Sequence, residues 1–155
     1  MKEPKFTWDE ETGIARCYIT IKNLSNQTII GEAHCHPEDM DMCSEKTGCE
    51  IAYFKAVIKM LKHYIDNNLQ PRLNALNKLY YSMNMSQQFN PKSYENKMLQ
   101  RQIRLTKNEL DTAKEWLDDR KVELKEYLKR KDDFYAMVRS MRRVEKEEEK
   151  HKADN

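Results

Sequence analysis

Apolar and polar residues alternate in the first third of the chain. The run Ile14-Ala-Arg-Cys-Tyr-Ile-Thr-Ile21 is rich in β-branched and aromatic residues, and it places one small or apolar face opposite a more polar one. The positions that share the apolar face are Ala15, Cys17, Ile19 and Ile21. Shorter segments of the same kind span Phe6–Trp8 and Thr28–His34, and a turn at Asp9–Gly13 joins the first two. Residues 1–36 are therefore predicted to form a small antiparallel sheet of three strands.

The spacing of apolar residues then changes to that of a helix, over residues 47–84. Thr47-Gly-Cys-Glu50 fits a capping box, with Thr47 as the N-cap. The apolar positions that follow are Phe54, Ile58, Leu61, Ile65, Leu69, Leu73, Leu76, Tyr80 and Met83. Pro71 lies inside this pattern, and proline lacks the N–H that the helix needs. We expect Pro71 either to kink one helix or to split it into two near residues 67–70.

A second and longer helix is predicted over residues 90–143. Asn90 can be its N-cap and Pro91 its first residue, and no glycine or proline follows Pro91. Ile103, Leu110, Leu117 and Leu124 lie seven residues apart, and their companion positions are Leu99, Thr106, Ala113, Arg120, Tyr127, Phe134 and Met141. The tail, residues 144–155, has no apolar stripe and is expected to fray.

These elements predict an α+β fold, with a small N-terminal antiparallel sheet followed by two long helices, in one domain over residues 1–143. A helix of about 50 residues would span roughly 75 Å, which exceeds the length of a small sheet. Part of its apolar seam therefore needs another partner. Self-association into a two-fold dimer is the simplest solution, giving an elongated, coiled-coil-like oligomer.

Composition narrows the possible functions. The chain has 155 residues, with 28 Lys and Arg against 26 Asp and Glu, a formal charge of +2. This balance argues against a broad basic surface for duplex DNA, so any basic patch must be local. The chain has neither an apolar run long enough to span a membrane nor the apolar core of a signal peptide. We therefore expect a soluble, cytoplasmic protein with no membrane partner. In a reducing cytosol its four cysteines are expected to be thiols.

Basic and amide side chains cluster where the long helix begins. Lys97, Arg101, Arg104 and Asn108 recur at i, i+4, i+7 and i+11, so they project along one stripe. Guanidinium forks bind phosphate oxygens in pairs, and a helix N-terminus adds N–H groups and partial positive charge. Phe89 precedes this stripe and could stack on a base. The alternative is an ordinary solvated face of a charged helix.

Metal and catalytic sites have little support. His34, His36, Cys43 and Cys49 offer zinc-ligand chemistry, but their spacing does not match the usual paired cysteines, so no metal site is predicted. Glycine-rich phosphate loops, nucleophile elbows and two-histidine helical zinc motifs are absent from the sequence. We therefore predict no catalytic residues, no cofactor and no enzymatic activity.

Five segments of the chain resemble the phage Thoeris anti-defence sponge proteins of the first-described type. These are Trp8-Asp-Glu-Glu-Thr-Gly13, Gly31-Glu-Ala-His-Cys-His-Pro37, Glu45-Lys-Thr-Gly-Cys-Glu50, Phe89-Asn-Pro-Lys-Ser-Tyr-Glu95 and Arg101-Gln-Ile-Arg104. The resemblance extends to about Arg143, and the segment that begins at Phe89 is its most specific part.

The resemblance implies a viral or prophage protein that acts in the bacterial host cell. Such proteins have an N-terminal sheet and long C-terminal helices, and form homodimers that can assemble into hexamers. They bind cyclic ADP-ribose isomers made by TIR-domain enzymes and sequester them without cleavage. The downstream NAD-depleting effector is then never activated. Some members also hold cyclic dinucleotides or trinucleotides at separate sites.

Within this frame, the chemistry of the side chains suggests their roles. We expect Phe89 to stack on adenine, and Asn90 and Asn96 to bind polar edges of the ligand. Arg101 and Arg104 are expected to bind the diphosphate, with Lys97 as a further cation. Spacing alone does not place Phe89 beside Arg104.

Two other functions remain open at this level. A structural coiled-coil adaptor would bind a protein partner through the apolar seam. A single-stranded nucleic-acid binder would use the aromatic and basic groups near Phe89, although the balanced charge makes it less favoured.

Overall fold

A three-stranded antiparallel sheet forms the N-terminal part of the fold in the computed structural model, which describes residues 2–22, 26–86 and 90–155. Its strands are β1 (Lys5–Asp9), β2 (Ile14–Ile21) and β3 (Gln27–His34), in the order β1-β2-β3. The turn between β1 and β2 ends at Gly13, whose φ of 65° is a conformation that glycine adopts without strain. The predicted sheet and its turn are confirmed.

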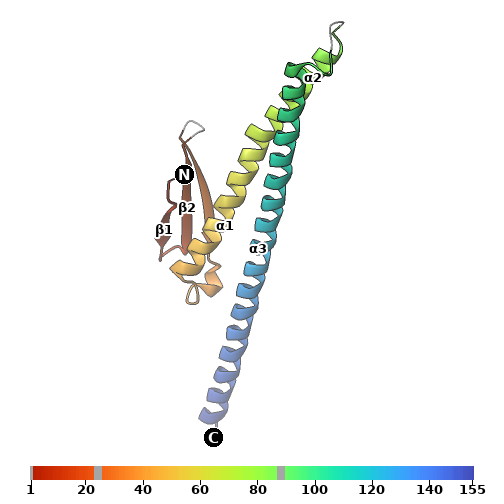
Figure 1. Ribbon diagram of the computed structural model, residues 1–155. Coiled ribbons are helices and arrows are strands. Elements are labelled where there is room, and N and C mark those ends of the chain that lie inside the picture. Colours follow the sequence, from red (N-terminus) through yellow and green to blue (C-terminus); the bar gives the residue numbers. More distant parts are fainter. Residues whose placement is uncertain (1, 23–25, 87–89) are drawn as a thin grey trace.

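Helix α1 (Glu45–Tyr64) covers the apolar face of this sheet (Figure 1). Ala15 and Cys17 are fully buried beneath it, and Ile19 is 2% exposed, as the alternation predicted. The contact with β3 is close at Gly31, because a Cβ there would lie 2.0 Å from the Ala52 carbonyl oxygen. The absence of a side chain at Gly31 therefore brings the backbones of α1 and β3 together.

The N-cap of α1 is Ser44, not Thr47 as predicted. Its Oγ accepts a hydrogen bond from the Thr47 N–H at 3.1 Å. Thr47 is thus the third helical residue, and its N–H is the group that is capped. Glu50, predicted to complete a capping box, instead accepts a hydrogen bond from the hydroxyl of Tyr127. The prediction missed the start because Ser44 lies at the end of a loop whose path is set by tertiary contacts.

A five-residue π-helix, Ile65–Leu69, joins α1 to α2 (Gln70–Asn84). The Gln70 N–H donates to the carbonyl oxygen of Ile65, five residues earlier. Pro71 then lies in the first turn of α2. The wider π turn accommodates proline without ending the helix. The first helix therefore continues without a break from Glu45 to Asn84, and its π-helical stretch at residues 65–69 overlaps the predicted site of disturbance at residues 67–70.

Helix α3 (Tyr94–Ala153) has 60 residues and runs back along α2 and α1 (Figure 1). Its N-cap is Ser93, so the prediction of Asn90 as N-cap and Pro91 as first residue is wrong. Asn90 instead begins a turn, in which its carbonyl oxygen accepts from the Ser93 N–H at 3.1 Å. The helix also continues through residues 144–153, where fraying was predicted. Glutamate and lysine favour a helix there even without packing.

The seam of α3 packs against the first helix. Leu110, Ala113 and Leu117 are buried against Leu69 and Leu73, with Leu69 fully buried. This part of the predicted seam is confirmed. Among residues 2–22, 26–86 and 90–155, no helix combines the length and apolar character needed to cross a membrane.

Further along α3 the buried face departs from the predicted heptads. Phe134 is 55% exposed and Met141 56%, whereas Tyr135 is only 5% exposed. Leu99, Leu117 and Tyr135 lie eighteen residues apart, which is about five turns at 3.6 residues per turn. A heptad repeat drifts by about 20° every seven residues on a straight helix. The buried residues thus recur at the helix period of 3.6 residues. After about five heptads the predicted seam positions no longer lie on the buried side of α3.

Candidate functional site at the start of α3

A short turn at residues 90–93 leads into α3. The Asn90 Oδ1 accepts from the Lys92 N–H at 3.0 Å, and the Ser93 Oγ accepts from the Asn96 N–H at 3.2 Å. The Asn96 amide reaches back over the turn, where its Nδ2 donates to the carbonyl oxygen of Asn90 at 3.3 Å. These bonds hold the turn against the first turn of the helix.

Asn96 differs from the expected ligand-binding side chain, because it is fully buried. Its Oδ1 has no hydrogen-bond partner among the described residues. A buried amide oxygen without a partner carries a desolvation cost. Asn96 therefore orders the turn in this arrangement, and its Oδ1, at the N-terminus of α3, is an acceptor that the described residues leave unused.

Three cations occupy the opposite face of the same turns. Lys97, Arg101 and Arg104 are all exposed. At about 100° per residue they project on the side of α3 that faces away from the Leu99 and Leu110 seam. None of the three forms an ion pair with a carboxylate in the described part of the chain. Their positive charge is therefore available to an external anion.

Two exposed side chains extend this cationic face. Tyr94 is 74% exposed and Leu105 is 45% exposed, and both project to the Arg101 side of the helix. Sequence reasoning did not single out Leu105. The signal for Leu105 was its i+4 position after Arg101, on the side opposite the heptad seam.

The structure divides the predicted site residues between two places. Asn90 and Asn96 lie together at the turn, whereas Lys97, Arg101 and Arg104 share the outer face of α3. Phe89 lies outside the described residues. The outer face of a single helix is convex, so a ligand held there by one chain would remain open to solvent on its other side.

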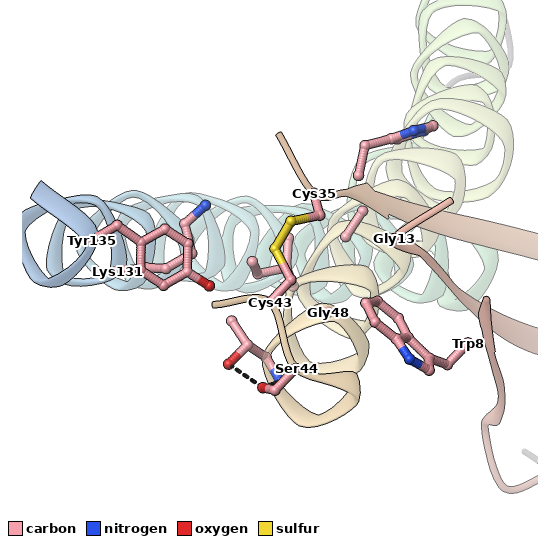
Figure 2. A pocket seen from close by; sticks show the side chains of 12 residues that line it. Trp8, Gly13, Cys35, Cys43, Ser44, Gly48, Lys131 and Tyr135 are labelled. Atoms are coloured by element: carbon pink, nitrogen blue, oxygen red, sulfur yellow. Dashed lines mark hydrogen bonds between the residues drawn. A yellow bond between two sulfur atoms is a disulfide. The ribbon is translucent and has the colours of Figure 1, made fainter. Parts of the chain in front are cut away.

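A different crevice lies where the sheet, the start of α1 and the far part of α3, residues 131–153, meet (Figure 2). Trp8, Gly48 and Tyr135 line it, and it encloses about 20 Å³, room for about one water molecule. Cys35 and Cys43 form a disulfide at its centre. The prediction that all four cysteines are thiols is therefore wrong for this pair, because the fold brings their Cα atoms to 6.3 Å.

The disulfide also bears on the zinc hypothesis. Cys43 is committed to Cys35, and Cys49 lies within α1. The described residues contain no group of three or more His, Cys, Asp or Glu side chains that could hold a metal ion. His34 instead contacts the carboxylate of Glu32, which also pairs with Arg16.

Tyr127, on α3, has a strongly raised pKa. Burial, followed by the hydrogen bond to Glu50, raises the pKa of Tyr127 to about 12. At neutral pH the hydroxyl is therefore protonated and donates to Glu50. This bond ties α3 to the first turns of α1.

Comparison with known proteins adds no assignment, because no family model, no curated protein and no solved structure matches this chain.

Proposed function

We propose that this protein is a viral or prophage anti-defence protein that sequesters cyclic ADP-ribose isomers made by TIR-domain enzymes. The observation that carries the proposal is the set of three cations at the start of α3. Lys97, Arg101 and Arg104 are exposed on one face and have no carboxylate partner in the described chain. The sequence resemblance supplies the class of ligand.

The spacing of the cations suits a diphosphate. Residues three apart on a helix are neighbours, with Cβ atoms about 5–6 Å apart. Arg101 and Arg104 can therefore reach adjacent phosphoryl groups, each through a planar fork of N–H donors. Lys97 adds a point charge one turn earlier, which favours a dianionic ligand over a single carboxylate.

We further propose that the site is completed by a second copy of the chain. The face of one helix supplies cations but contacts a ligand on one side only. In a two-fold dimer, the second chain covers the side of the ligand that would otherwise face solvent. In the family that the chain resembles, dimers assemble further into hexamers. Sequestration needs a slow release, and enclosure between two chains provides it. Cyclic oligonucleotides belong to the same proposal as a second class of ligand.

The experiment mixes the purified protein with the product of an activated TIR enzyme and passes the mixture through a filter that retains protein. The retained protein is then heat-denatured, and both fractions are tested for activation of the NAD-depleting effector. Signal missing from the filtrate but recovered after heating is the expected result. Loss from both fractions means hydrolysis, and an unchanged filtrate means no binding; either result contradicts the proposal.

Calorimetry with matched variants tests the cationic face. Arg101→Ala and Arg104→Ala should each weaken binding at least tenfold, about 1.4 kcal/mol. Lys114→Ala, an exposed cation further along α3, should leave the affinity unchanged. Equal affinities for all three variants would contradict the diphosphate role.

A structural adaptor is the second candidate, favoured by one observation. Phe134, Met137 and Met141 are each more than half exposed on the far part of α3, which suits a protein partner. The adaptor predicts no affinity for the cyclic nucleotide and a loss of function in Phe134→Ser/Met141→Ser. The sponge predicts that this double variant still retains the ligand on the filter.

A further inference from the structure

The loop between β3 and α1 is the point at which the far part of α3 is attached. Asp39, in the short 3-10 helix η1 (Pro37–Asp39), accepts two hydrogen bonds from Arg139, at 3.0 and 2.9 Å. Asp41 pairs with Arg142. The Tyr135 hydroxyl donates to the carbonyl oxygen of Met42 at 3.4 Å. Three contacts within eight residues of α3 therefore end on three residues of one loop, Asp39, Asp41 and Met42.

The disulfide closes this same loop. Cys35 follows the last residue of β3, and Cys43 precedes the N-cap of α1, so the bond joins the two ends of the segment that carries Asp39 and Asp41. Figure 2 shows the two sulfur atoms between Gly13 and Tyr135. A cross-link over so short a segment restricts the backbone that presents both carboxylates.

Little else holds the far part of α3. Leu124, Tyr127 and Leu128 still pack on the core beneath the sheet, but after Leu128 only Tyr135 of this helix is buried, and residues 139–153 are all exposed. A helix segment with few buried apolar contacts opens at low free energy. Its attachment therefore depends on the order of the loop that it contacts.

We propose that the Cys35–Cys43 disulfide is a redox switch for the attachment of residues 131–143 of α3. With the bond intact, the loop presents Asp39 and Asp41 to the arginines of the helix. With the bond reduced, the loop loses the cross-link between its two ends, and this part of α3 separates from it. The inference does not rest on the proposed ligand.

The step is thiol–disulfide exchange with a low-molecular-weight thiol. The thiolate of one such molecule attacks one protein sulfur, forms a mixed disulfide and releases the other protein sulfur as a thiolate, which takes up a proton. A second thiol molecule attacks the mixed disulfide and releases the second protein thiol. Two electrons and two protons pass to the protein, and the small thiol leaves as its own disulfide. Cys35 and Cys43 are each half-buried, which leaves the bond within reach.

The switch is remote from the proposed ligand site. Arg104 and Arg139 are separated by 35 residues of helix, which is about 50 Å at 1.5 Å per residue. The first turns of α3 also pack on the π-helix and α2, not on the loop. The two proposals can therefore fail independently.

Hydrogen–deuterium exchange of the full chain tests the switch, with the oxidised protein compared to protein reduced by dithiothreitol. Amides in residues 131–143 should exchange at least tenfold faster after reduction, whereas residues 99–117 of the same helix should be unchanged. Equal rates in the two redox states would overturn the proposal. So would equal acceleration of both segments, because the bond would then stabilise the fold as a whole.

Two variants test the route through the loop. Cys35→Ala/Cys43→Ala should show the fast exchange without dithiothreitol and no response to it. Asp39→Asn should accelerate exchange of residues 131–143 while the disulfide is intact, because it removes the charge that Arg139 binds. Continued protection of this segment in oxidised Asp39→Asn would show that the loop does not hold the helix in this way.

Discussion

Asp39 and Arg139 are a hundred residues apart in the chain and are joined by two parallel hydrogen bonds. The carboxylate belongs to a side chain that is 9% exposed, and the guanidinium to one that is 44% exposed. A paired geometry of this kind is the strongest form of an Arg–carboxylate contact. It fixes the loop before α1 against the far part of α3.

Loss of this pair should destabilise the protein. Asp39→Asn keeps the shape of the side chain but removes its charge, and we expect the free energy of unfolding to fall by about 1–3 kcal/mol in urea titrations. Asp41→Asn is the matched control. Its pair with Arg142 is exposed on both sides, so its loss should cost at most about 1 kcal/mol. Equal effects of the two variants would contradict the importance of burial at Asp39.

A methyl group at Gly31 should disrupt the packing of α1 on the sheet. The added Cβ would lie 2.0 Å from the Ala52 carbonyl oxygen and 2.5 Å from the Ala56 nitrogen, both backbone atoms. We expect Gly31→Ala to lower the free energy of unfolding by at least about 3 kcal/mol, because the helix itself must shift.

Gly48→Ala provides the comparison for Gly31. Its Cβ would meet side-chain atoms of Ala15 and Trp8 at 2.9 Å. The methyl group also raises helix propensity within α1 by about 1 kcal/mol, which offsets part of the crowding. Its effect on chemical denaturation should be clearly smaller than that of Gly31→Ala, and the reverse order would contradict this explanation.

Removal of a buried hydroxyl should stabilise α3. Thr106 is fully buried, and its Oγ1 has no hydrogen-bond partner among the described residues. Valine has a similar shape without the polar atom, so Thr106→Val should raise the free energy of unfolding by about 1 kcal/mol. Thr112→Val, at an exposed position of the same helix, should change it by less than about 0.5 kcal/mol. A destabilised Thr106→Val would show that the hydroxyl has a partner in solution.

Stability at alkaline pH should depend on Tyr127. Its pKa is about 12 in the folded protein, against about 10 in an unfolded chain. Between these values the unfolded state has lost the proton and the folded state retains it, so the free energy of unfolding falls as pH rises from about 10 to 12. Below pH 10 the contribution is fully present.

Tyrosinate absorbance at alkaline pH measures this titration directly. The wild-type protein should show an ionisation step near pH 12, and Tyr127→Phe should remove it while the other seven of the eight tyrosines remain. Persistence of the step in Tyr127→Phe would mean that another phenol is responsible. Tyr64 and Tyr135, whose pKa values are also raised, would be tested next.

Much of the candidate site was visible in the sequence, but its arrangement was not. The i, i+4, i+7 spacing correctly placed Lys97, Arg101 and Arg104 on one exposed face, because helix geometry alone sets that relation. The burial of Asn96 could not be foreseen, since it depends on how the turn before α3 folds back. The exposed position of the cations likewise depends on which face α2 covers.

The sequence by itself determined the elements whose causes are local. Alternation of apolar residues in Ile14–Ile21 specified a strand and its buried face, and the lack of glycine and proline after Pro91 allowed one helix to continue to Ala153. Both signals arise from residues a few positions apart, and backbone geometry converts them into structure with little outside help.

Only the tertiary structure decided the relations between distant residues. Tyr135 is buried in place of Phe134 because α3 is straight enough for its buried side to follow the 3.6-residue period, from which a heptad repeat drifts. Cys35 meets Cys43, and Asp39 meets Arg139, because β3, α1 and α3 converge on one loop. Such contacts depend on the paths of three elements at once, and no local pattern of residues encodes them.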